Sequence, residues 1–279
     1  MNTKIALVTG ASSGIGEATA LKLKALGYTV YAAARRVDRM RALAGTGINI
    51  LAMDVTNDAS MQAGVQEIID KSGRIDVLIN NAGYGSYGAV EDVPLDEARA
   101  QFDVNVFGAV RLIQLALPHM RKRLSGTIVN ITSMGGKVHT PLGAWYHGTK
   151  FALEAISDCL RLEVQPLGID VVVIEPGGIN TEWAGIAADK LRETSSEGAY
   201  AEQANALLKT MVSEANRKRM SPPDLIADTI GKVLSARRPK TRYAVGFGAK
   251  PMIFLRRLLS DRAFDSFIRM ATGIPRKGV

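Results

Sequence analysis

Residues 5–16 have the sequence Ile5-Ala6-Leu7-Val8-Thr9-Gly10-Ala11-Ser12-Ser13-Gly14-Ile15-Gly16, an apolar run followed by a turn with three glycines. A continuous apolar run of this length is typical of a strand that is buried on both faces. In the turn, Gly10 permits a tight bend, Gly14 lets the backbone approach an anion, and Gly16 allows the next helix to pack closely. The free N–H groups and the dipole at the start of that helix favour a pyrophosphate. The glycine spacing differs from the usual dinucleotide fingerprint, so a tight turn without a ligand remains an alternative.

The alternation of strand and helix continues along the chain. Further apolar runs occupy residues 28–34, 48–53, 77–80, 127–131 and 170–175, and each follows a stretch with helical spacing. Repeated units of this kind predict an α/β protein with a parallel, doubly wound sheet flanked by helices. Because open parallel sheets bind ligands beyond the carboxyl ends of their strands, we expect the chemistry in the residues just after each run.

The composition is that of an ordered globular protein, with 279 residues, 47% hydrophobic and 22% charged. Cys159 is the single cysteine, so no internal disulfide can form, which suits a reducing compartment such as the cytoplasm. The first apolar run is too short for a signal peptide, and no stretch approaches the roughly 18 apolar residues of a spanning helix.

The net charge of +8 is concentrated at one end of the chain. Residues 237–279 contain eleven Lys and Arg against two Asp, a net +9, which leaves −1 for the preceding residues. A nearly neutral body with a basic tail argues against a nucleic-acid partner and for an appended surface element. We therefore expect one dinucleotide-binding and catalytic domain over 1–250 and a basic extension over 251–279.

Within this extension, residues 251–270 place Phe, Leu and Ile at helical spacing between arginines. This pattern predicts a basic amphipathic helix. Such a helix can lie on an anionic membrane surface, in which case the protein would be peripheral to the membrane. It can equally fold over the substrate cleft or form a subunit interface.

Two arginines, Arg35 and Arg36, follow the second predicted strand. An acidic residue at this place would bind the adenosine ribose of NAD, and the chain has none. Guanidinium groups can instead bind a 2′-phosphate through charge-assisted hydrogen bonds, which favours NADP(H) as the cofactor. The alternative is a solvated arginine pair on a surface loop.

Taken together, the motifs resemble those of the short-chain dehydrogenase/reductase family. They occur in the family's order over about residues 3–250: Thr9-Gly10-x-x-x-Gly14-x-Gly16, Asn80-Asn81-Ala82-Gly83, Asn105, Ser133, Tyr146-x-x-x-Lys150 and Pro176-Gly177. The resemblance implies an NAD(P)-dependent oxidoreductase on a single Rossmann domain, commonly with seven strands. Residues 31–36 and 80–85 are similar to the lipid- and steroid-type members, such as NADP-preferring 17β-hydroxysteroid and retinol dehydrogenases.

The chemistry of the Tyr146–Lys150 pair fits this family. Four residues apart on a helix, the two side chains share one face, so the ammonium can approach the phenol. A phenol ionises near pH 10, and a neighbouring cation together with the positive nicotinamide would lower that pKa. We therefore expect Tyr146 to carry the proton, and Ser133, just beyond the strand at 127–131, to hold the reacting oxygen.

Other roles follow only from the resemblance. Lys150 would also hold the nicotinamide ribose, and Asn105 would hold a water that links Lys150 to solvent. Thr181 would hold the carboxamide, although the family's threonine lies closer to Pro-Gly and Asn180 adjoins it here. The remaining cofactor positions are those of the glycine turn and of three strand ends: Ser12, Ser13, Ile15, Asp54, Val55, Asn81, Ala82, Gly83, Pro176 and Gly177.

Substrate specificity should reside in residues 134–143 and 182–220. The second segment mixes apolar and charged residues, and it predicts either a helical lid over a lipophilic substrate or an ordinary surface helix pair. His119, His139 and His147 lack the clustering of a metal site, so no metal is expected. Ser133 does not lie in a nucleophile elbow, which disfavours a hydrolase.

The sequence therefore predicts an NADP(H)-dependent carbonyl reductase or alcohol dehydrogenase that acts on a steroid-, retinoid- or fatty-type substrate. A protein that senses NADP without turnover, and an adaptor that uses only the basic tail, are the alternatives. The resemblance also implies a homodimer or homotetramer that pairs through helices at about 95–117 and 144–167.

Overall fold

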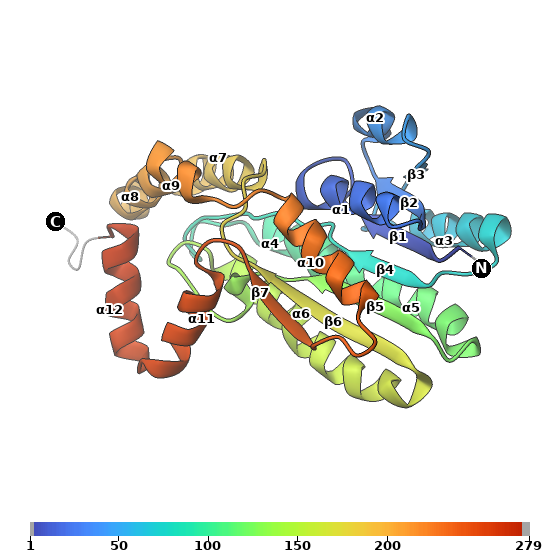
Figure 1. Cartoon of the computed structure of the whole chain (residues 1–279). Coiled ribbons are helices and arrows are strands. Elements are labelled where there is room, and N and C mark those ends of the chain that lie inside the picture. The colour runs from blue at the N-terminus through green and yellow to red at the C-terminus, as the bar shows by residue number, and fades with distance from the viewer. Residues whose placement is uncertain (1–2, 275–279) are drawn as a thin grey trace.

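All seven strands of the central sheet run parallel, in the order β3-β2-β1-β4-β5-β6-β7 (Figure 1). The computed structural model describes residues 3–274. The strands are β1 (Ile5–Thr9), β2 (Thr29–Ala34), β3 (Asn49–Ala52), β4 (Val77–Asn80), β5 (Gly126–Ile131), β6 (Ile169–Pro176) and β7 (Arg242–Val245). The strand order reverses between β1 and β4, and the predicted doubly wound fold is thereby confirmed.

Helices cover both faces of the sheet. They are α1 (Gly14–Ala25), α2 (Arg41–Ala44), α3 (Asp58–Ser72), α4 (Leu95–Phe102), α5 (Gly108–Lys122), α6 (Ala144–Val164), α7 (Trp183–Ser195), α8 (Ala201–Met211), α9 (Glu214–Arg219), α10 (Asp224–Ser235), α11 (Ala249–Leu258) and α12 (Asp261–Thr272). On β1, Ala6 and Val8 join a buried cluster with α1 and α10, whereas Leu7 joins a second cluster with α3, α5 and α6. Because helices shield both faces of the sheet from solvent, successive residues of a strand are buried on opposite faces, and the strands appear in the sequence as continuous apolar runs.

The C-terminal segment differs from the single helix expected over 251–270. It forms two helices, α11 and α12, with extended backbone at Leu259 and Ser260 between them. The break separates α11 from α12, and Ile253 on α11 and Phe264 and Ile268 on α12 are all buried. Both helices lie at the same end of the molecule as α7, α8 and α9 (Figure 1).

None of the helices within residues 3–274 is long and apolar enough to cross a membrane. Cys159, on α6, is an exposed free cysteine.

Candidate active site

The ends of β1 and β4 are joined by side-chain hydrogen bonds at the point where the strand order reverses. The Asn81 amide donates to the carbonyl of Thr9 at 2.9 Å and to that of Gly10 at 3.3 Å. The Thr9 hydroxyl in turn accepts from the backbone N–H groups of Asn81 and Ala82, each at 3.0 Å. The structure thus places the glycine turn and the Asn81–Gly83 segment side by side.

The glycine turn has the geometry of an anion cradle. Gly10 and Gly14 have φ of +64° and +58°, which favours glycine. A Cβ on Gly16 would lie 2.3 Å from the carbonyl oxygen of Gly10, so α1 packs against the turn too closely for a side chain. Ser13, the residue before α1, makes no side-chain cap, which leaves the first N–H groups of the helix free for a ligand. These features fit a pyrophosphate.

The two arginines after β2, Arg35 and Arg36, are exposed at the edge of this cradle. A third, Arg39, forms a bidentate ion pair with Glu182 at the start of α7, with one N–O distance of 3.0 Å. No pattern in the sequence predicts this pair, because its members lie 143 residues apart. It connects the segment after β2 with the segment after β6.

Two further predicted positions, Asp54 and Val55, follow β3. The Asp54 carboxylate accepts from the backbone N–H and the hydroxyl of Thr56, at 2.9 and 2.8 Å. Val55 lies against α5, where its carbonyl oxygen is 2.5 Å from where a Cβ on Gly108 would be. Both residues therefore shape the loop after β3.

Tyr146 and Lys150 lie on α6, and each is 7% exposed. The Lys150 ammonium is 6.0 Å from the centre of the Tyr146 ring and donates to the carbonyl of Ile131 at 2.9 Å. The Ser133 hydroxyl, two residues beyond the end of β5, lies near the Tyr146 phenol and acts to lower its pKa. The three side chains are thus brought together, as the motif requires.

Burial sets the protonation of this group. It raises the pKa of Tyr146 to about 12, with the nearby Ser133 hydroxyl acting in the opposite direction. Burial also lowers the pKa of Lys150 to about 8, while the charge of Glu154 raises it. The sequence-based expectation that the pKa of Tyr146 is lowered is therefore wrong for the chain alone, because desolvation of the phenolate outweighs the opposing effect of Ser133.

Asn105 lies in a single wider helical turn, Asp103–Phe107, between α4 and α5. Its side chain accepts from the Tyr84 N–H at 3.0 Å and donates to the Tyr84 carbonyl at 2.9 Å and to the Thr149 hydroxyl at 3.1 Å. It therefore fastens the segment after β4 to α6. A Cβ on Gly83 would lie 3.0 Å from the Asn105 oxygen and 3.7 Å from the Lys150 nitrogen, so this glycine keeps the space between them open.

The segment after β6 lies beside both the cradle and Ser133. Ser133 donates to the carbonyl of Pro176 at 3.4 Å, and the Gly177 N–H donates to Val245 of β7 at 2.8 Å. Thr181 approaches the glycine turn, since its methyl group is 3.0 Å from where a Cβ on Gly14 would be. The Thr181 hydroxyl accepts from the backbone N–H of Trp183 at 3.3 Å.

An aromatic group that the sequence did not reveal surrounds Tyr146. The ring centres of Trp183 and Tyr87 lie 4.9 and 5.8 Å from that of Tyr146, and 6.0 Å from each other. Gly85 makes room for Trp183, because a Cβ there would be 2.4 Å from the indole. The only sequence signal for Tyr87 was an aromatic residue shortly after the Asn80–Gly85 turn.

The apolar side of α7 and α8 covers this aromatic group. One buried cluster contains Tyr87, Ala89, Leu142, Tyr146, Ala187, Ala188, Leu191, Ala204, Leu207 and Leu208. The helices α7 and α8 therefore pack in one cluster with Tyr146, with apolar side chains turned inward.

Below Lys150, a buried carboxylate joins three parts of the fold. Glu154 accepts from the Thr132 hydroxyl at 2.6 Å, from Lys137 at 2.9 Å and from Arg242 of β7 at 3.0 Å. Sequence reasoning missed this residue because its partners come from three distant segments. Its one visible signal was the four-residue spacing from Lys150, which places both on one face of α6.

Comparison with known proteins agrees with this geometry. A model of the short chain dehydrogenase family matches residues 4–191. The chain belongs to the short-chain dehydrogenase/reductase family. This family member is an oxidoreductase. It is 36% identical over 247 residues to a 3-ketodihydrosphingosine reductase of Bacteroides thetaiotaomicron, covering 88% of this chain and 89% of the relative.

Solved structures of the family superpose on the chain over most of its length. A short-chain dehydrogenase from Streptomyces avermitilis matches with a TM-score of 0.82 and 32% identity, covering 99% of both chains. A metagenomic short-chain oxidoreductase in complex with NADP matches with a TM-score of 0.69 and 26% identity, covering 87% of this chain and 96% of that one.

Proposed function

We propose that this family member is an NADP(H)-dependent carbonyl reductase or alcohol dehydrogenase with Tyr146 as the proton carrier and a lipophilic substrate. The observation that carries the proposal is the meeting of Ser133, Tyr146 and Lys150 beside the anion cradle of the glycine turn. A bound NADP(H) would supply or accept the hydride. The chain's own residues would hold the substrate oxygen and move its proton.

The protonation of Tyr146 suits it for carbonyl reduction. With a pKa near 12 the phenol keeps its proton at neutral pH, so it can donate that proton to the oxygen while a hydride reaches the carbon. Addition of one hydride and one proton converts the carbonyl to an alcohol. Ser133 would hold the oxygen during the transfer, and the Lys150 ammonium would stabilise the phenolate that remains. Alcohol oxidation reverses each transfer.

The choice of NADP(H) is supported by charge. Arg35 and Arg36 directly follow β2, and no acidic residue takes the place that would bind the ribose of NAD. The family structure in complex with NADP supports the same cofactor class.

A lipophilic substrate is supported by the lining of the cover. The side chains of α7 and α8 that pack in one cluster with Tyr146 are Ala, Leu, Trp and Met, which would give a substrate carbon chain or ring system apolar neighbours. The relative named for 3-ketodihydrosphingosine reduction supports a fatty-type ketone, and residues 31–36 resemble the steroid- and retinoid-type members. We place this activity in the cytoplasm.

We also propose a homo-oligomer. The joined helices α4 and α5 expose Leu95 and Phe107 at 58% and 60%, and α6 exposes Phe151. A hollow of about 390 Å³ lies between these helices, lined by Leu95, Ala98, Arg99, Phe102, Asp103, Phe107 and Trp145. Large exposed apolar side chains around a hollow mark a protein interface.

The test of the activity is NADPH consumption with methyl ketones of increasing chain length. We expect the rate to rise with chain length, and Tyr146→Phe to lower it about 100- to 10,000-fold because the proton donor is lost. Tyr28→Phe, on the sheet face covered by α1 and α10, serves as the control and should leave the rate unchanged. Tight NADPH binding without turnover of any carbonyl would contradict the proposal and favour an NADP sensor.

A further inference from the structure

The helix α11 presents a mixed apolar and basic stripe to solvent. Phe254 and Leu258 are 66% and 68% exposed, and Lys250 and Arg257 beside them are also exposed. The four residues follow the spacing i, i+4, i+7 and i+8, so they lie on one face of the helix. We call Lys250, Phe254, Arg257 and Leu258 the α11 stripe.

The opposite side of the helix is firmly attached to the molecule. Ile253 is buried, and Met252 packs in a cluster with Phe264 and Ile268 of α12 and with Met134 and Val138. These last two belong to residues 134–143, one of the two segments expected to set substrate specificity, which we call the substrate segment. His139 and Asp265 are joined at 3.2 Å. Since these contacts already order both short helices, a surface that binds the α11 stripe would not have to supply the free energy of helix formation.

The charge of α11 and α12 indicates what kind of surface can bind the α11 stripe. Of the acidic residues on α11 and α12, Asp261 pairs with Arg256 at 2.7 Å and Asp265 contacts His139. Lys250, Arg257, Arg262 and Arg269 form no ion pair with any residue in the range 3–274. The occupant must therefore be apolar at its centre and negatively charged around it, and a second copy of this basic face would be repelled.

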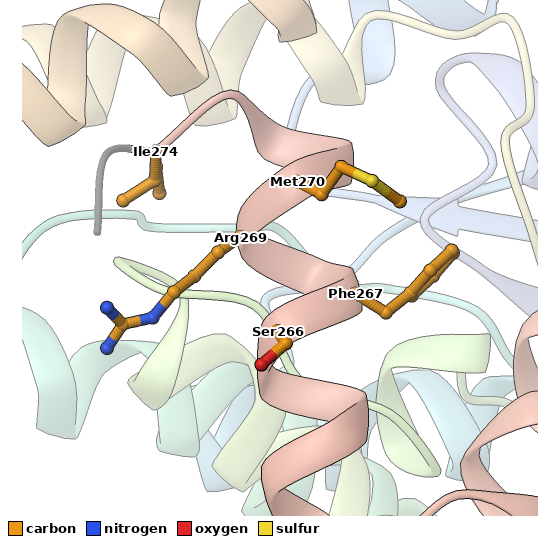
Figure 2. Close-up of a pocket in the computed structure, with 5 residues that line it drawn as sticks. All are labelled: Ser266, Phe267, Arg269, Met270 and Ile274. Carbon is orange, nitrogen blue, oxygen red and sulfur yellow. The ribbon is translucent and has the colours of Figure 1, made fainter.

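A second apolar hollow lies on the neighbouring helix. It has a volume of about 390 Å³ and is lined by Ser266, Phe267, Arg269, Met270 and Ile274. Figure 2 shows Phe267 and Met270 projecting from one side of α12 and Arg269 from the other. Exposed apolar side chains next to arginines thus occur on both C-terminal helices.

We propose that the α11 stripe docks on an anionic lipid surface, with Phe254 and Leu258 inserted among the lipids and the basic residues at the headgroups. Insertion of a few apolar groups alone gives a protein little affinity for a membrane. Insertion combined with attraction between basic residues and anionic lipids gives stable peripheral binding. The buried side of the same helices packs on the substrate segment, so docking would bring that segment to the bilayer. This deepens the proposed function, because a lipophilic substrate would be collected from the membrane.

The test is sedimentation of the full chain with vesicles of phosphatidylcholine alone or mixed with phosphatidylglycerol. We expect binding only to the phosphatidylglycerol vesicles, and weaker binding at raised salt because the attraction is electrostatic. Phe254→Ser combined with Leu258→Ser should lower the affinity about tenfold or more, since two apolar side chains no longer insert. Leu21→Ser with Leu26→Ser removes two exposed leucines at α1 and should leave binding unchanged.

Three outcomes would overturn the docking proposal. These are absence of binding at low salt, undiminished binding by the α11 variant, and a change in oligomeric state of that variant, which would assign the stripe to a second copy. NADPH consumption with a water-soluble ketone, measured without vesicles, separates the two proposals. Turnover without vesicle binding removes only the docking, whereas vesicle binding without turnover of any ketone removes only the enzymatic proposal.

Discussion

At the scale of single residues, the buried histidine next to Tyr146 makes stability depend on pH. One ring nitrogen of His147 bonds the carbonyl of Gly135 at 2.9 Å, and the other accepts from the Thr140 N–H at 3.1 Å. Burial lowers the pKa of His147 to about 4, below the value near 6.5 of an unfolded histidine. Only the unfolded chain therefore takes up this proton as the pH falls from 6.5 to 4.

We therefore expect the free energy of unfolding to fall by on the order of 3 kcal/mol as the pH is lowered from 6.5 to 4, because of this histidine. His147→Gln should show a flatter dependence of the melting temperature on pH between 6.5 and 4, even if it melts lower at pH 7. Thermal unfolding followed by circular dichroism measures both. Equal slopes for the two proteins would assign the acid sensitivity to other groups.

The glycines of the chain differ in whether the structure has space for a Cβ atom in place of the hydrogen. A Cβ on Gly16 collides with the backbone oxygen of Gly10, whereas one on Gly185 in α7 meets nothing within 4 Å. We expect Gly16→Ala to lower the free energy of unfolding by about 1–3 kcal/mol and to weaken NADPH binding, because the cradle must open. Gly185→Ala should be neutral or raise stability by up to about 1 kcal/mol. Urea unfolding and fluorescence titration with NADPH would test this, and unaltered NADPH affinity in Gly16→Ala would argue against a phosphate cradle.

The arginines after β2 should set the cofactor preference. Replacing Arg35 and Arg36 together by Ser should weaken NADPH binding about 10- to 100-fold, because charge-assisted hydrogen bonds to the 2′-phosphate are lost. NADH lacks that phosphate, so its affinity should change little. Titration of NADPH and of NADH into the unmodified protein and into the double variant gives the ratio of the two affinities for each protein. A parallel loss of NADH affinity would mean that the arginines support the loop rather than the phosphate.

At the scale of elements, α6 depends on the carboxylate below its active-site face. Glu154 is 3% exposed and accepts from Thr132, Lys137 and Arg242. Glu154→Ala should lower the free energy of unfolding by on the order of 3 kcal/mol, because Lys137 loses its carboxylate and Arg242 loses one of its three. Asp158→Asn, which alters a more exposed ion pair of the same Arg242, should cost less than about 1 kcal/mol. Urea unfolding of the two variants would settle it, and equal losses would show that the buried position has no special role.

The elements also show where sequence reasoning succeeds and where it ends. The six predicted strands appear with each end within one residue of its prediction, because strands buried on both faces are continuous apolar runs. The seventh, β7, was expected only from the family resemblance, since its four residues are half-buried and include Arg242. The break between α11 and α12 was missed because it serves contacts with Val138, far away in the chain.

In the candidate site, too, local patterns were predicted from the sequence and contacts between distant segments were not. Local spacing predicted that Tyr146 and Lys150 share a face, and strand ends predicted that the glycine turn, Asn81 and Ser133 gather at one edge. Pairings across the fold, such as Arg39 with Glu182 or Tyr87 with Trp183, leave no periodic signal. The sign of the Tyr146 pKa shift was also beyond the sequence, because it depends on how completely the helices α7 and α8 exclude water.

At the scale of the whole molecule, the order of the chain fixes the order in which the site is completed. All the residues of the cradle and of the Ser133, Tyr146 and Lys150 group precede α7, so a growing chain has made them well before its last helices emerge. The substrate segment, however, packs against Phe264 of α12 through Val138. His139 of the same segment bonds to Asp265, which lies 126 residues later in the chain. A ribosome-bound chain that ends at β7 would therefore carry the whole sheet with its substrate segment still uncovered. The contacts that this segment makes with α11 and α12 can therefore form only after residues 249–272 have been synthesised.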